Sequence, residues 1–263
     1  MDLGIRDKVA MVAASSRGLG RAVAEALAAE GARLALCARN ETVLAATADA
    51  IRARFGVEVL DRALDVTDAA AVGAFVSETV ERFGTVHIGV ANAGGPPSKS
   101  FAETTTQDWC SAFELNFMST LHLIRELAPH MQRQRWGRIV SITSITVKQP
   151  TDGLILSNAI RAGVAGLMKS LSNEYAGDNI LFNNVCPGFT ATDRLNEVAA
   201  SLAKSQGVAP EEIVGRWTRA IPAGRLGRPE ELAAVVAFLC SEKAGYVTGS
   251  SVAVDGGAVK GIF

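Results

Sequence analysis

This chain of 263 residues has no marked excess of either charge, no long hydrophobic run and no cluster of cysteines. Because 26 Lys and Arg stand against 27 Asp and Glu, the formal net charge is only −1, which leaves no basic field to hold a nucleic acid. The apolar runs are much shorter than the roughly 18 residues that a membrane-spanning helix needs, and the first residues are too polar for a signal peptide. We therefore expect a soluble, cytoplasmic protein with no nucleic-acid or membrane partner.

Metal ligands and disulfide partners are also missing at useful spacings. The four cysteines, Cys37, Cys110, Cys186 and Cys240, lie dozens of positions apart, so they form neither a CxxC pair nor a zinc ribbon. The three histidines have no cysteine or carboxylate at ligand spacing. We expect free thiols packed as small apolar residues, and no metal site.

Hydrophobic residues make up 48% of the chain, and their spacing predicts the fold class. Short apolar runs alternate with longer segments of helical period, which is typical of a parallel sheet with crossover helices. We expect one α/β domain over residues 1–263, a doubly wound Rossmann fold of about seven parallel strands with helices on both faces. The strands are expected at residues 9–14, 33–37, 57–64, 86–91, 138–143, 180–186 and 250–254. Two short helical patterns at 190–228 predict a mobile lid over the substrate.

Three glycine-containing turns follow strands of this sheet, and they predict a nucleotide site. The first strand leads into Gly18 and Gly20 at the start of a helix, where backbone N–H groups and the helix dipole favour a pyrophosphate. Taken alone, this Gly-x-Gly pattern is explained about as well by an ordinary tight turn between strand and helix as by a pyrophosphate site. Residues 92–95 and 187–190 supply similar turns after the fourth and sixth strands, at the carboxyl edge where such folds bind ligands.

Motifs along nearly the full chain are similar to those of the short-chain dehydrogenase/reductase family, and 3-oxoacyl carrier-protein reductases are among the relatives that it most resembles. The matching pieces are Gly18-x-Gly20, residues 65–68, Asn92-Ala93-Gly94, Asn116, residues 138–144, Pro187-Gly188 and residues 254–257. The resemblance implies a nicotinamide cofactor, with Asp65 near the adenine and Asn92 near the adenosine ribose. The expected cofactor-binding residues are Ser15, Ser16, Arg17, Gly18, Leu19, Gly20, Arg39, Asp65, Val66, Asn92, Ala93, Gly94, Arg161, Pro187, Gly188 and Thr190.

One departure affects the first turn, because Ala13 and Ala14 stand where the family has a threonine and its first glycine. A position that needs positive φ penalises alanine by about 1 kcal/mol or more. The turn is therefore either tolerant of alanine or reshaped.

Charge at the end of the second strand favours NADP over NAD. An acidic residue there would bind the ribose 2′-hydroxyl of NAD, but this chain has Arg39. With Arg17 on the glycine-rich turn, two guanidinium groups would flank a 2′-phosphate. The alternative is that both arginines are ordinary solvated surface residues.

The catalytic positions carry a second departure. In the family a serine polarises the carbonyl, a tyrosine gives the proton, a lysine four residues later lowers the tyrosine pKa, and an asparagine orders water. Ser144 and Asn116 match two of these, but Ser157 and Arg161 stand in place of the tyrosine and lysine. An aliphatic hydroxyl is a far poorer acid than a phenol. We expect Ser144, Ser157 and Arg161 to polarise the substrate, with a proton from water ordered by Asn116 or from Lys148.

Three functions remain open at this point. The first is an atypical NADP-dependent oxidoreductase that acts on a small carbonyl, hydroxyl or 3-oxoacyl substrate. The others are a nucleotide-binding, non-catalytic or regulatory homologue, and a dehydratase or isomerase using the same pocket.

The residues that would bind a carrier protein bear on the substrate. The resemblance implies that carrier-protein reductases bind an acidic partner with two basic residues. Arg135 matches one of them, but the other falls on Asp178, so a free small molecule or acyl thioester is favoured. We also expect a homo-oligomer, either a dimer or a tetramer.

Overall fold

A seven-stranded parallel sheet forms the centre of the computed structural model, which describes residues 1–262. The strand order is β3-β2-β1-β4-β5-β6-β7, so the chain reverses direction across the sheet between β1 and β4. Doubly wound folds bind ligands at this reversal, outside the carboxyl ends of the strands. The strands are β1 (Val9–Val12), β2 (Arg33–Ala38), β3 (Val59–Ala63), β4 (Ile88–Ala91), β5 (Gly137–Ile142), β6 (Ile180–Pro187) and β7 (Ser251–Val254).

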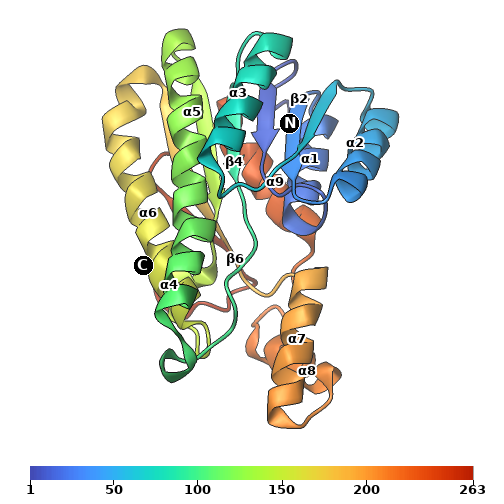
Figure 1. The fold of residues 1–263 in the computed structure, drawn as a ribbon, viewed down its shortest axis with the longest axis vertical. Helices are drawn as coiled ribbons and strands as arrows, with labels where there is room; N and C mark the ends of the chain where they lie inside the picture. The colour runs from blue at the N-terminus through green and yellow to red at the C-terminus, as the bar shows by residue number, and fades with distance from the viewer. Residues whose placement is uncertain (263) are drawn as a thin grey trace.

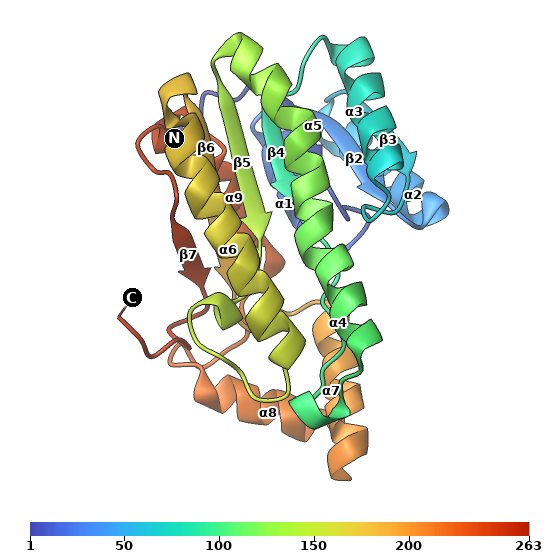
Figure 2. The same cartoon turned by 60° about the vertical axis from the view of Figure 1, so that its left-hand side comes forward.

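Helices cover both faces of the sheet, as Figures 1 and 2 show. One apolar cluster joins α1, α2 and α9 to the sheet, and a second joins α3, α5 and α6 to the opposite face. The helices are α1 (Gly18–Ala29), α2 (Glu41–Phe55), α3 (Ala69–Phe83), α4 (Thr106–Phe113), α5 (Ser119–Gln134), α6 (Ile155–Tyr175), α7 (Asp193–Gln206), α8 (Pro210–Ala220) and α9 (Pro229–Leu239).

The strands expected from the sequence are confirmed. Every strand lies within two residues of its expected bounds at either end. Asp68 caps α3, because its carboxylate accepts hydrogen bonds from the N–H groups of Ala70 and Ala71. Pro229 begins α9, where its missing N–H costs nothing. The doubly wound class is therefore correct.

Two local differences bear on the site. The first strand ends at Val12 instead of residue 14, because Ala14 takes the left-handed conformation with φ +47°. Asn116 does not lie in a regular α-helix, since a π-helical segment, Glu114–Met118, joins α4 to α5. Single π-turns of this kind occur frequently at functional sites.

The α7 and α8 helices extend past the carboxyl end of the sheet as a separate pair (Figures 1 and 2). They have a small apolar cluster of their own, built on Ala199, Ala203 and Ile213. Gly207, with φ +66°, ends α7, and Pro210 begins α8. The two short helical patterns within 190–228 are thus confirmed as helices, whereas the lid role stays a prediction.

Candidate active site

The glycine-rich turn, residues 13–20, is shaped by two left-handed positions. Ala14 has φ +47° and Gly18 has φ +59°, so the turn keeps a glycine-like conformation at the position where alanine replaces the family's glycine. Ser15 is fully buried, and its N–H and Oγ both donate to the carbonyl of Cys37. The carbonyl of Ser16 accepts a hydrogen bond from Thr47 Oγ1 at 2.9 Å. These bonds fix the turn to β2 and α2, so the turn tolerates alanine and is not reshaped.

Asn92 braces the turn from the neighbouring strand, a role that sequence reasoning missed. Its Nδ2 donates to the carbonyl oxygens of Ala13 and Ala14, each at 3.3 Å. A Cβ at Gly20 would lie 2.7 Å from the same Nδ2 and would collide with the Ala14 carbonyl. Only glycine at position 20 allows this approach, which leaves the start of α1 open to a ligand.

Asp65 and Val66 follow β3 at the same edge of the sheet. The Asp65 carboxylate accepts hydrogen bonds from the N–H and hydroxyl of Thr67, at 3.0 and 2.9 Å. The backbone hydrogen bond from Thr67 is the main cause that lowers the Asp65 pKa, and the charge of Arg39 adds to it. Val66 lines a small cavity with Asn92, Leu64 and Phe75. Asp65 thus forms a local turn and lies within the electrostatic reach of Arg39.

The two arginines expected to hold a 2′-phosphate are both exposed, but they have different neighbours. Arg17 caps α1 and forms an ion pair with Glu197 of α7 at 3.9 Å. Arg39 directly follows β2, and its charge acts on Asp65. No hydrogen bond joins Arg17 to Arg39 within residues 1–262. Arg17 would therefore have to leave its exposed pair with Glu197 to meet an anion between the ends of β1 and β2.

The remaining cofactor-binding candidates lie on the same carboxyl edge. Gly188 packs against the backbone of Asp255, where a Cβ would come within 2.8 Å of the Asp255 Cα. Thr190 Oγ1 donates to the Gly188 carbonyl at 3.4 Å. Ala93 lines a second small cavity, which lies beside Arg161 and Asn116. Pro187 ends β6, and Leu19 packs against the apolar cluster that includes α1.

Three hydroxyl groups gather between the end of β5 and the start of α6. Ser144 caps a short 3₁₀ helix, Ile145–Val147, and its Oγ accepts a hydrogen bond from the Thr146 N–H at 3.2 Å. Thr146 Oγ1 lies 3.2 Å from Ser157 Oγ, and either hydroxyl can donate. Thr146 and Ser157 are buried, at 3% and 7% exposure. The structure therefore connects the two expected catalytic serines through Thr146, a residue that no sequence motif indicated.

Arg161 lies one helical turn after Ser157 and points into the fold. Its Nη1 donates to the carbonyl oxygens of Ile142 and Thr143, at 3.0 and 2.7 Å. A Cβ added at Gly95 would lie 4.0 Å from Nη2, so the guanidinium faces the loop after β4. No ion pair among residues 1–262 includes Arg161. Loss of hydration on burial lowers its pKa to about 10, which leaves it charged at neutral pH.

Asn116 projects from the π-helical segment toward the same place. Its Nδ2 donates to the Gly94 carbonyl at 2.8 Å, whereas its Oδ1 is buried and has no partner in the described part of the chain. Asn116, Arg161 and Thr120 line one small cavity. An orphaned acceptor beside an uncompensated cation favours a polar occupant such as water. The four expected catalytic residues thus lie in two neighbouring polar clusters, with Ser144 and Ser157 in one and Asn116 and Arg161 in the other.

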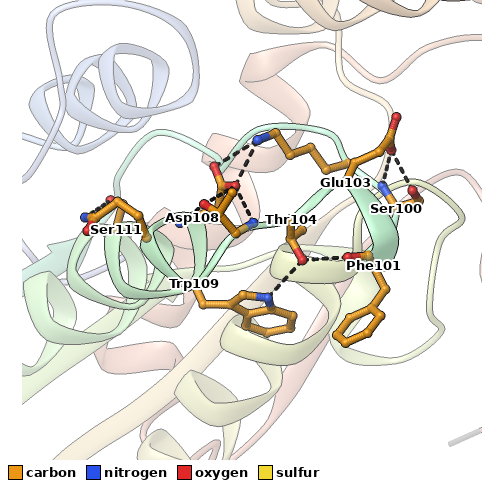
Figure 3. Close-up of polar contacts among 10 residues, drawn as sticks. Ser100, Phe101, Glu103, Thr104, Asp108, Trp109 and Ser111 are labelled. Carbon is orange, nitrogen blue, oxygen red and sulfur yellow. Dashed lines mark hydrogen bonds and ion pairs between the residues drawn. The ribbon is translucent and has the colours of Figure 1, made fainter.

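The loop after β4 forms one wall of this region, and a polar network holds it (Figure 3). Lys99 Nζ donates to both carboxylate oxygens of Asp108, at 3.0 and 2.9 Å. Mainly through that bond, the pKa of Asp108 falls to about 2. The Trp109 ring nitrogen donates to Thr104 Oγ1. Because the backbone of Lys99 pairs with Leu154 just before α6, the network joins α4 to the helix that carries Ser157 and Arg161.

The α7 and α8 pair contacts two segments at the carboxyl end of the sheet. Phe189, after β6, stacks on Trp217 of α8 with ring centroids 5.0 Å apart. Arg194 Nη2 donates to the Pro96 carbonyl at 3.3 Å, which connects α7 to the loop after β4. The α7 and α8 pair is therefore connected both to the segment after β6 and to the braced loop after β4.

Neither tyrosine of the chain replaces the absent phenol. Tyr175 is the last residue of α6, and its ring packs on Phe182 with centroids 5.6 Å apart. Tyr246 is fully exposed in the loop before β7. Within the described residues, no group of three or more possible metal ligands occurs, and no helix is long and apolar enough to cross a membrane.

Comparison with known proteins agrees with this geometry. A family model described as enoyl-(acyl carrier protein) reductase matches residues 13–259. The 3-oxoacyl-(acyl-carrier-protein) reductase of Aquifex aeolicus is 34% identical over 257 residues, which cover 98% of this chain and 99% of the relative. The chain belongs to the short-chain dehydrogenase/reductase family.

Other members of the short-chain dehydrogenase/reductase family resemble the chain over its whole length. The Escherichia coli (strain K12) 3-oxoacyl-(acyl-carrier-protein) reductase is 34% identical and covers 97% of this chain and 98% of its own. L-sorbose reductase from Gluconobacter frateurii, solved in complex with NADPH and L-sorbose, superposes with a TM-score of 0.94 at 36% identity, over 100% of both chains. The resemblance to this family that the sequence indicates is therefore confirmed.

Proposed function

We propose that the protein is an NADP-dependent oxidoreductase that transfers a hydride between the nicotinamide and a small carbonyl or hydroxyl compound, or a free 3-oxoacyl thioester. The observation that carries the proposal is the buried Arg161 guanidinium, which no carboxylate compensates in residues 1–262 and which lies one turn from Ser157. A fixed positive charge in a water-poor site stabilises negative charge that develops on a substrate oxygen.

The residues present fit a dinucleotide. The glycine-rich turn leaves the start of α1 open, and only glycine at position 20 permits the approach of Asn92 and Ala14. Arg17 and Arg39 would hold the 2′-phosphate of NADP, with Arg17 released from its exposed pair with Glu197. Relatives solved with NADPH, including the sorbose reductase, support this choice over NAD. When bound, NADPH supplies the hydride.

The chain's own groups would then manage charge and protons. Ser144 and Ser157 would donate hydrogen bonds to the carbonyl oxygen, and Arg161 would stabilise the charge that forms there. The proton would come from water held near the free Oδ1 of Asn116, or from Lys148, which follows the 3₁₀ helix after Ser144. Within residues 1–262 only Nη1 of Arg161 has hydrogen-bond partners, so Nη2 and Nε would hold the nicotinamide ribose.

A free substrate is favoured over one carried by an acidic protein. Arg135, the basic residue that matches the carrier-binding pattern, pairs with Asp178 at 3.4 Å and also donates to the Gly177 carbonyl at 2.9 Å. That pairing reduces the positive charge offered to a partner, and Asp178 itself would repel an acidic one. The expected cytoplasmic location and homo-oligomer stay predictions.

Steady oxidation of NADPH with a panel of aldehydes, ketones and 3-oxoacyl thioesters tests the proposal. Ser157→Ala should lower kcat by roughly tenfold or more, because it removes a donor to the developing oxyanion. Ser170→Ala in the same helix is the matched control, since that exposed hydroxyl donates to the Gly166 carbonyl and has no other partner within residues 1–262. Tight NADPH binding without turnover on any substrate would instead favour the non-catalytic function.

A second candidate reaction is reduction of a C=C bond conjugated to a carbonyl. The serine in place of a tyrosine at position 157 favours it, and so does the enoyl reductase description of the matching family model. Hydride addition to the β-carbon places the negative charge on an enolate oxygen, which needs hydrogen bonds but no immediate proton, and water then protonates the α-carbon. A matched pair, 2-cyclohexenone and cyclohexanone, separates the two reactions by product analysis.

A further inference from the structure

Thr146 contacts both serines of the proposed carbonyl site. Its backbone N–H donates to Ser144 Oγ at 3.2 Å, and its side-chain Oγ1 lies 3.2 Å from Ser157 Oγ. In residues 1–262, neither the Thr146 hydroxyl nor the Ser157 hydroxyl has another hydrogen-bond partner. Thr146 is buried, at 3% exposure.

The direction of the hydrogen bond follows from what a carbonyl oxygen needs. A carbonyl oxygen only accepts, so Ser157 must give its single proton to the substrate. The Thr146 hydroxyl must then donate to Ser157 Oγ. A hydroxyl that accepts one hydrogen bond becomes a stronger donor in the next, because each bond polarises the other. The Ser144 oxygen likewise accepts a hydrogen bond, from the Thr146 N–H, so the Ser144 proton is also left to donate.

We propose that Thr146 is a positioning residue that directs the O–H groups of Ser144 and Ser157 toward the same substrate oxygen. The inference depends on the proposed oxidoreductase function. The backbone N–H of Thr146 occupies a lone pair of one serine and its hydroxyl occupies a lone pair of the other, so each serine is left with its proton to donate. Ser144 caps the short 3₁₀ helix that contains Thr146, so the N–H of Thr146 contacts Ser144 while its hydroxyl contacts Ser157.

Thr146→Val tests the proposal, because it keeps the β-branched shape and the backbone N–H and removes only the hydroxyl. We expect kcat to fall roughly tenfold, the usual scale for one hydrogen bond, while the Kd for NADPH stays unchanged. Thr146→Ser should keep most of the activity. In a Ser157→Ala background, Thr146→Val should add little, because Thr146 acts through Ser157.

Thr79→Val is the matched control, since Thr79 is fully buried and, among the described residues, its hydroxyl bonds to the Phe75 carbonyl in α3 alone. If Thr146→Val does not fold, Thr146→Ser against Thr146→Ala makes the same comparison. Three results would overturn the proposal. They are a wild-type kcat in Thr146→Val, a loss of kcat in Thr146→Ser as large as in Thr146→Val, and effects of Thr146→Val and Ser157→Ala on kcat that are fully additive. No effect of Ser157→Ala itself would instead contradict the proposed function.

Discussion

Ala14 offers a direct test of how the nucleotide turn is built. It lies in the left-handed region with φ +47°, where an L-residue with a Cβ costs about 1 to 2 kcal/mol. Ala14→Gly removes that strain, but it also increases the freedom of the unfolded chain, which costs roughly 0.5 to 1 kcal/mol. The difference predicts a net stabilisation of about 0.5 to 1 kcal/mol.

Thermal and denaturant unfolding measure this difference. For a chain of this size, the expected stabilisation corresponds to a rise in Tm of about 1 to 3 °C. Ala13→Gly is the matched control, because the neighbouring Ala13 is 4% exposed, belongs to the core and is absent from the positive-φ positions. We expect Ala13→Gly to lower the stability by about 1 kcal/mol or more. A lower Tm for Ala14→Gly would refute the strain argument.

Two further predictions concern the cofactor and the pH dependence of stability. Arg39→Ala should weaken NADPH binding by roughly tenfold or more and leave NADH binding nearly unchanged, which paired titrations would show; equal losses for both cofactors would remove Arg39 from the phosphate site. His87, whose Nδ1 accepts from the Val9 N–H at 3.0 Å, has its pKa lowered to about 4, mainly by burial. The unfolded chain therefore binds more protons between pH 6.5 and about 4, so stability should fall as the pH falls through that window. His87→Gln should flatten the change in Tm between pH 7 and 5, and an unaltered slope would exclude His87 as its cause.

The sheet was predictable because its signals are local. Buried parallel strands appear as short apolar runs, and residues such as Asp68 and Pro229 mark helix starts through bonds to their immediate neighbours. In each case, a few adjacent residues determine the outcome. The sequence left open whether the first turn tolerates Ala14 or is reshaped, and the positive φ decides that it tolerates it.

The arrangement within the site was harder to predict, because it depends on contacts between distant segments. Asn92 reaches Ala13 and Ala14 across almost 80 residues of chain, and the Ser157 contact with Thr146 spans a loop. The π-helical turn that presents Asn116 has no sequence signature. The ribose contact expected of Arg161 stays a prediction, whereas the bonds from its Nη1 to the carbonyls of Ile142 and Thr143 are a geometry that only the packing determines.

The uncompensated guanidinium has a consequence for the pH–rate profile. A tyrosine that donates protons loses this ability as it ionises, so its activity depends on pH near its pKa. Serine and threonine hydroxyls do not ionise in water at ordinary pH, and Arg161, with a pKa of about 10, stays charged well above neutrality. If water supplies the proton, kcat should be level from roughly pH 6 to 9, and a clear rise or fall within that range would contradict this proton source.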